Sequence, residues 1–305
     1  VPHHAQVAVL LAQQPHQLKL HLVGVLVFVH QDILEQVLVV VQHIGEIGKQ
    51  LHRQQDNVVK IHRIGGFQPS CIVIVATIRA LKYNGGVPKE KLAEENLDAL
   101  KNGIANLGAH IDNMRLYGVP VVVAMNHFDT DTEAEIALVS AYCDQKGTPH
   151  AYSDVFAKGG AGGIELAKTV CDVIEKNEGA TRFAPIYDTD SSIEEKIQIV
   201  AEKIYHAGHV AYTSAAKKAI RDIEALGMDK LPICVAKTQY SLSDDPKLLG
   251  APSGFTITVK DVRVSAGARF IVVYTGAIMT MPGLPKVPAA ERIDVDENGV
   301  IDGLF

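Results

Sequence analysis

A glycine-rich run, KGGAGG at residues 158–163, lies between a short apolar segment and a helical pattern. Backbone amides at a helix start attract anions, so this run could bind a phosphate with Lys158 as a cationic partner. Its spacing is neither GxxxxGK[ST] nor GxGxxG, and glycines also form plain turns with positive φ. Lys158, Gly159 and Gly160 are therefore candidates for a substrate or phosphate cleft, with a flexible turn as the alternative.

A second candidate group is the sequence NHFD at residues 126–129. It is similar to the NKxD box with which some nucleotide-binding proteins recognise a purine, but histidine replaces the lysine. Alternatively, Asn126 and Asp129 cap the turn into the next helix, as Asn and Asp commonly do. Phe128 is expected at a loop tip, where an aromatic ring either packs into the core or faces a planar ligand.

Strands and helices that alternate from Ser70 onward must position these residues. Continuous β-branched runs predict buried parallel strands at 71–77 and 119–126, and a shorter strand is expected at 151–156. Apolar spacings of three and four predict helices at 94–117, 132–145, 164–177, 193–205 and 215–226. Two further apolar runs, 257–267 and 269–276, predict a strand pair that need not belong to the same sheet.

This alternation indicates right-handed βαβ crossovers and a parallel sheet. Ligands bind such sheets at the carboxyl ends of the strands, so the loops after Thr77, Asn126 and Val155 are the expected location of a site. Arg79 and Lys82 follow the first strand. They either meet a phosphate or form a solvated face.

Composition excludes several classes of function. The net charge of −6 and pI near 6.1 give no basic field for nucleic acid. The four cysteines form no CxxC pair and are expected to be reduced structural thiols in a cytoplasmic protein. Polar residues interrupt the apolar segment 21–41, so no membrane span is expected, and no histidine or cysteine spacing predicts a metal site.

Residues 1–67 differ in composition from the rest of the chain. They hold eight of the 13 histidines, and no Ser, Thr, Tyr, Met or Cys occurs before Ser70. Such a composition is unusual for a folded domain. We interpret residues 1–67 as an unrelated segment or an out-of-frame translation.

From about Pro69 to Phe305 the chain resembles the C-terminal half of formate–tetrahydrofolate ligase. The stretches that carry the resemblance follow the family's order along the chain: VIVATIRALKYNGGV (73–87), EENLDALKNGIANL (94–107), GVPVVVAMNHFDTDTEAEI (118–136), AKGGAGGIELA (157–167), LPICVAKTQYSLSDDPKLLG (231–250) and IMTMPGLPKVPAAERIDVDENGVIDGLF (278–305).

The resemblance implies an incomplete P-loop NTPase-like parallel sheet with helices on both faces, plus a C-terminal α/β subdomain. Residues 68–118 would end the nucleotide-binding domain, and residues 119–305 would form the folate side. The implied reaction phosphorylates formate with ATP and Mg²⁺, and N10 of tetrahydrofolate then attacks formyl phosphate to give 10-formyltetrahydrofolate. The family's GEGKTT-type P-loop does not occur in this sequence, so the chain alone is expected to be inactive. The alternative is a non-catalytic remnant that binds folate or pairs with other subunits.

The resemblance also assigns residues. Phe128 matches one of the two aromatic residues that stack on the pterin ring, and Phe156 replaces the second, a tryptophan in the family's SEVWAKGG pattern. Ser265, Ala266 and Gly267 match a turn near the nucleotide pocket, where Arg269 replaces the family's usual glycine. The family further implies a homotetramer and a bound monovalent cation, while the catalytic residues on the ATP side cannot be assigned in this chain.

Overall fold

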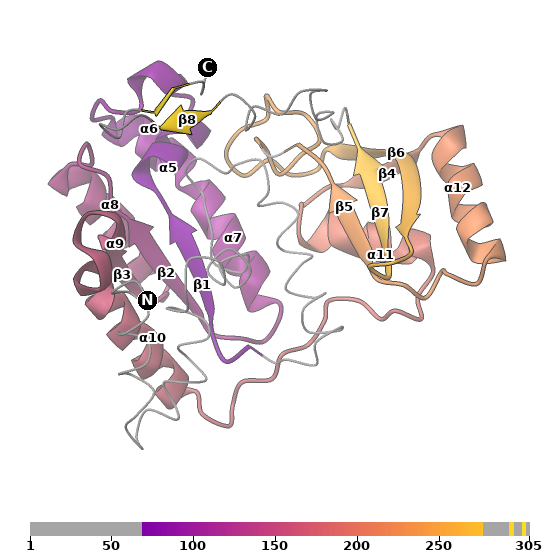
Figure 1. The fold of residues 1–305 in the computed structure, drawn as a ribbon, viewed down its shortest axis with the longest axis horizontal. Coiled ribbons are helices and arrows are strands. Elements are labelled where there is room, and N and C mark those ends of the chain that lie inside the picture. The colour runs from indigo at the N-terminus through magenta and orange to yellow at the C-terminus, as the bar shows by residue number, and fades with distance from the viewer. Residues whose placement is uncertain (1–68, 239, 277–292, 296–300, 303–305) are drawn as a thin grey trace.

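The structure, a computed structural model, describes residues 69–238, 240–276, 293–295 and 301–302. Two α/β units lie side by side in this part of the chain, the first drawn in indigo and magenta and the second in orange (Figure 1). The segment 1–67, expected to be unrelated to the rest, lies outside the described residues.

A parallel three-stranded sheet forms the centre of the first unit. Its strands are β1 (Ile72–Ala76), β2 (Val121–Asn126) and β3 (His150–Ser153), in the order β1-β2-β3. The predicted parallel sheet is thereby confirmed. The third strand is shorter than predicted: it ends at Ser153, because the Asp154 amide turns away from the sheet and donates to the Gly162 carbonyl at 3.0 Å.

Helices cover both faces of this sheet, as predicted. On one face, alternate strand residues such as Ile74 and Val123 join one core with α5 (Ile78–Asn84), α7 (Ala105–Arg115) and α8 (Glu133–Gln145). On the opposite face, Val73 and Val122 pack against α10 (Ile164–Lys176). Successive strand residues point to opposite faces of the sheet, so alternate residues belong to one core and the others to the second. This is the pattern of a sheet that is buried on both faces.

The helix predicted over 94–117 is instead two helices, α6 (Leu97–Gly103) and α7, so the prediction of one continuous helix is wrong. Asn96 caps α6 by accepting a hydrogen bond from the Ala99 amide at 2.9 Å. At the end of α6, a Cβ added to Gly103 would lie 1.9 Å from the Leu81 carbonyl oxygen. Only glycine permits this close crossing with α5.

A second sheet contains four strands in the order β4-β6-β7-β5. β6 (Thr256–Ser265) and β7 (Phe270–Thr275) are antiparallel, which confirms the predicted strand pair; the prediction left open whether the pair belongs to the first sheet. β4 (His209–Tyr212) and β5 (Ile233–Ala236) flank them in parallel orientation. The remaining elements are α9 (Val155–Lys158), α11 (Ile193–Lys203), α12 (Ser214–Ala225), β8 (Asp294–Val295), β9 (Ile301–Asp302) and two 3₁₀ turns, η2 (Lys89–Lys91) and η3 (Gly159–Gly163).

Helix α7 joins the two units. Its buried Asn106 side chain donates to the Gly250 carbonyl, and that of Asn113 donates to the Ile204 carbonyl, both at 2.7 Å. One apolar cluster continues from the first sheet through α7 into the second sheet. In the described part of the chain, no helix is both long and apolar enough to cross a membrane.

Candidate functional site

The two loops that leave β2 and β3 begin at the same edge of the first sheet. Asn126 pairs in register with Ser153, and the His127 amide donates to the Ser153 carbonyl at 3.0 Å. Adjacent strands lie about 4.8 Å apart, so the two loops start next to each other. Phe128 follows on the first loop and Phe156 on the second. The structure therefore places both predicted aromatic residues at neighbouring strand ends.

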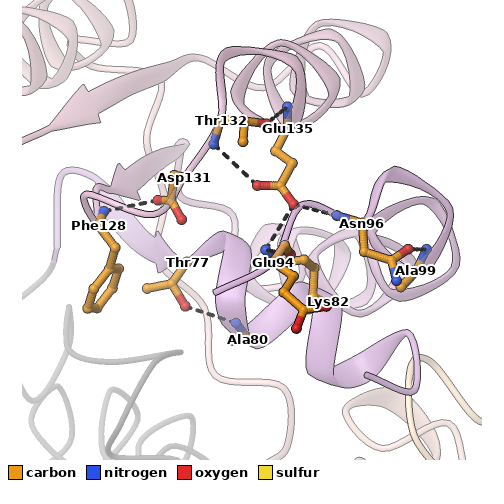
Figure 2. A network of polar contacts seen from close by, with 10 residues as sticks. All are labelled: Thr77, Ala80, Lys82, Glu94, Asn96, Ala99, Phe128, Asp131, Thr132 and Glu135. Atoms are coloured by element: carbon orange, nitrogen blue, oxygen red, sulfur yellow. Dashed lines mark hydrogen bonds and ion pairs between the residues drawn. The ribbon is translucent and has the colours of Figure 1, made fainter. Parts of the chain in front are cut away.

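Phe128 is held by its backbone while its ring remains partly exposed. Its amide donates to Asp131 Oδ2 at 3.0 Å, and the Asp131 amide donates back to the Phe128 carbonyl at 2.8 Å. Figure 2 shows the ring pointing away from the neighbouring polar network. The Arg79 guanidinium lies 5.2 Å from the centre of this ring, within the range of a cation–π contact.

Phe156 lies in the short helix α9 and is 97% exposed. Its neighbour Val155 is 37% exposed, and Ile164, at the start of α10, is 49% exposed. No neighbouring side chain in the described part of the chain therefore covers the Phe156 ring. The Phe156 ring thus has both faces available to a planar ligand.

Asp154 links the two loops through its side chain, which is only 11% exposed. Oδ1 lies 3.3 Å from His127 Nδ1, and Oδ2 lies 2.8 Å from the Lys158 ammonium. Hydrogen bonds from Lys158 and then from His127 lower the pKa of Asp154. An ionised carboxylate only accepts hydrogen bonds, so His127 Nδ1–H donates to it.

The glycine-rich run forms a turn, with η3 following α9 directly. Gly159 has φ of 57°, a conformation that favours glycine. A Cβ at Gly162 would lie 2.2 Å from the Asp154 carbonyl oxygen, so the run folds back tightly on the strand end. Glycine is therefore needed here for the turn itself, and phosphate binding by Lys158, Gly159 and Gly160 stays a prediction.

A pocket beneath the β2 loop is lined by Thr77, Asn126, His127 and Asp131 among others, and it leaves space for about one water molecule. Asp131 Oδ1 is buried and has no hydrogen-bond partner among the described residues. Burial raises the pKa of this carboxyl group. The pocket is too small for a purine or a pterin, so a ligand of that size must bind over the loops.

Lys82 has neither of the roles that the sequence left open. Its ammonium lies 2.9 Å from Glu135 Oε1 with both side chains fully buried, and it donates to the Glu94 carbonyl at 2.8 Å (Figure 2). Burial alone would raise the pKa of Glu135, but hydrogen bonds from Lys82 and from the Asn96 and Thr132 amides lower it. Lys82 is thus a structural ion-pair residue, neither a phosphate ligand nor part of a solvated face.

Ser265, Ala266 and Gly267 lie at the β6–β7 turn of the second sheet rather than at the carboxyl edge of the first. Arg269 in the same turn has φ of 54°, a left-handed conformation that side chains disfavour. The structure does not place this turn beside Phe128 or Phe156. A nucleotide pocket at the turn stays a prediction.

The potential metal ligands and the cysteines of the described residues are arranged as follows. No group of three or more His, Cys, Asp or Glu side chains is arranged there to hold a metal ion. The four cysteines are free thiols. Burial raises the pKa of Cys71 to about 12, so this thiol is protonated and unreactive at neutral pH.

The roles of Phe128 and Phe156 stay predictions, and neither Asp154 nor the contact between Arg79 and Phe128 was predicted from the sequence. The only sequence signal for Asp154 was its place two residues before Phe156. The family model of formate–tetrahydrofolate ligase matches residues 43–305 of the chain. This range holds every site residue discussed above, and it extends into residues 43–67 of the segment expected to be unrelated.

Proposed function

The chain belongs to the formate–tetrahydrofolate ligase family, and from this premise we propose that it supplies the tetrahydrofolate-binding part of an ATP-dependent ligase. The ligase joins formate to tetrahydrofolate, through formyl phosphate, and yields 10-formyltetrahydrofolate, ADP and phosphate. N10 of the bound folate attacks the formyl carbon. The part assigned to this chain is to bind the pterin ring and orient N10 for that attack.

The observation that carries this proposal is the exposed Phe156 ring, on the loop that leaves the strand next to the one that Phe128 follows. A pterin is flat and polar at its edges, so it gains most from aromatic faces and from polar groups around them. Phe128 and Phe156 supply the faces. Asn126 at the end of β2 supplies an amide near the ring edge.

ATP chemistry is not assigned to residues of this chain. The sequence contains no GEGKTT-type P-loop, and the described residues hold no cluster for Mg²⁺. We therefore propose that the phosphate-handling groups lie on polypeptide outside this sequence, and that this chain alone does not turn over ATP. The bound monovalent cation, the tetramer and the cytoplasmic location implied by the family remain predictions without residues assigned to them.

The test combines an activity assay with a binding assay on the same preparation. The chain is incubated with formate, MgATP and tetrahydrofolate, and ADP and 10-formyltetrahydrofolate are measured. Tetrahydrofolate binding is measured by isothermal titration calorimetry. We expect binding without turnover. Product formation by the chain alone would contradict the assignment of the ATP site elsewhere, and absence of binding would contradict the folate site.

The matched variants are Phe156→Ala and Leu226→Ala. Leu226 is 69% exposed near the end of α12 in the second unit, away from the strand-end loops. Both changes remove an exposed apolar side chain, so neither should alter folding. Only Phe156→Ala is expected to weaken tetrahydrofolate binding.

A further inference from the structure

A single carboxylate connects the two loops that carry the aromatic rings. Phe128 lies on the loop from β2 to α8, and Phe156 lies in α9 after β3. The backbone hydrogen bond from His127 to Ser153 joins the two loops where they begin, and among the described residues no other loop backbone hydrogen bond connects them. The separation of the rings therefore depends on side-chain contacts between the loops.

Asp154 lies on the second loop and makes such a contact with His127 on the first, while its other oxygen bonds Lys158 on its own loop. His127, bonded to Oδ1, immediately precedes Phe128, and Lys158, bonded to Oδ2, follows Phe156 by two residues in the same short helix. The His127 ring also packs on Tyr152 with ring centres 4.8 Å apart, which limits its rotation. Each oxygen of the carboxylate thus fixes one of the two loops.

Limited exposure strengthens the His127 half of this bridge, whereas the Lys158 half is an i,i+4 pair with a lysine that is 67% exposed. The side chains of Asp154 and His127 are 11% and 20% exposed. Hydrogen bonds to an ionised group are shorter and stronger than neutral ones, particularly where water has limited access. The Asp154 amide is also fixed by the Gly162 carbonyl and its carbonyl by the Lys158 amide, so the carboxylate is presented on a rigid backbone.

We propose that Asp154 is a positioning residue: by holding His127 and Lys158 it sets the separation of Phe128 and Phe156, so that a planar pterin ring fits between them. This inference rests on the proposed folate site. Asp154 itself does not touch the ligand. Lys158 is then a residue that fixes α9 and not a free cation for phosphate.

The test measures tetrahydrofolate affinity by calorimetry in the whole chain, with thermal unfolding recorded for every variant. Asp154→Asn keeps the shape of the side chain but loses its charge, and we expect about tenfold weaker binding, the effect of one lost positioned charge-assisted contact. Asp154→Glu retains the charge and is expected to recover most of the affinity. A residue needed only for packing would not be rescued by the longer side chain.

A second pair of variants keeps the test valid if Asp154→Asn does not fold. Lys158→Met removes one half of the bridge at a position that is 67% exposed, and Lys168→Met removes a comparable pair with Glu165 in α10, where Lys168 is 65% exposed. We expect about threefold weaker binding for Lys158→Met and unchanged binding for Lys168→Met.

The outcomes separate this inference from the function on which it rests. If the wild-type chain binds tetrahydrofolate and Asp154→Asn and Lys158→Met bind it equally well, the role of Asp154 is refuted and the folate site stands. If the wild-type chain does not bind tetrahydrofolate, both are overturned. If Lys168→Met weakens tetrahydrofolate binding as much as Lys158→Met does, the proposed role of the bridge is also contradicted.

Discussion

Replacing Phe156 by tryptophan should strengthen tetrahydrofolate binding without changing the stability of the chain. Phe156 is 97% exposed, so neither ring contributes to the folded core. The larger indole offers more stacking area to a pterin. An aromatic pair contributes about 0.5–1.5 kcal/mol beyond area burial, and a gain of that size corresponds to about twofold to tenfold tighter binding.

The variant also provides its own probe. The chain contains no tryptophan, so Phe156→Trp introduces a single indole whose fluorescence is expected to change when tetrahydrofolate stacks on it. Calorimetry on wild type and variant gives the two affinities under the same conditions. Equal affinities, or an indole signal that does not respond to saturating tetrahydrofolate, would refute the stacking role of residue 156.

Three further predictions concern stability, each measured by urea denaturation. Arg269→Gly should stabilise the chain by about 1 kcal/mol, because φ of 54° is strained for arginine; an unchanged midpoint would contradict this. Burial lowers the pKa of Lys237 from 10.5 to about 7. Between these two values the unfolded chain binds more protons than the folded chain, so the contribution of Lys237 to the free energy of unfolding rises with pH from about 7 to about 10.5. In Lys237→Met this rise in the free energy of unfolding should be absent. Parallel pH profiles of wild type and variant would contradict the prediction. Lys82→Met should lower the free energy of unfolding by about 3–5 kcal/mol, because it leaves the buried Glu135 carboxylate unpaired. Lys101→Met, at a position that is 62% exposed, should lower it by less than about 1 kcal/mol. Similar losses in the two variants would show that burial does not decide the effect.

The strands and most helices could be predicted because their patterns are local. The β-branched runs at 72–76 and 121–126 allow little besides buried parallel strands. Helix α8 could be placed closely because Thr132 and Glu135 form a capping box at its start. The division between α6 and α7 was not predictable, since it depends on the close crossing of Gly103 with a carbonyl of another helix.

The site was partly predictable for the same reason. Phe128 and Phe156 were assigned by resemblance to the family, and the loops that carry them could be placed after strands from the order of elements along the chain. The bridge at Asp154 depends on the register between β2 and β3, which pairs Asn126 with Ser153 and is not visible in sequence. The burial of Lys82 likewise depends on the packing of α8 against α5, which brings in Glu135 from a distant part of the sequence.

The most direct test of the account is a calorimetric titration of the wild-type chain with tetrahydrofolate, repeated on a double variant that carries Phe128→Ala and Phe156→Ala. The account predicts saturable binding to one site in the wild-type chain. In the double variant it predicts affinity lower by more than about tenfold. Absence of binding by the wild-type chain, or equal affinity in the double variant, would contradict the assignment of the pterin site to these two loops.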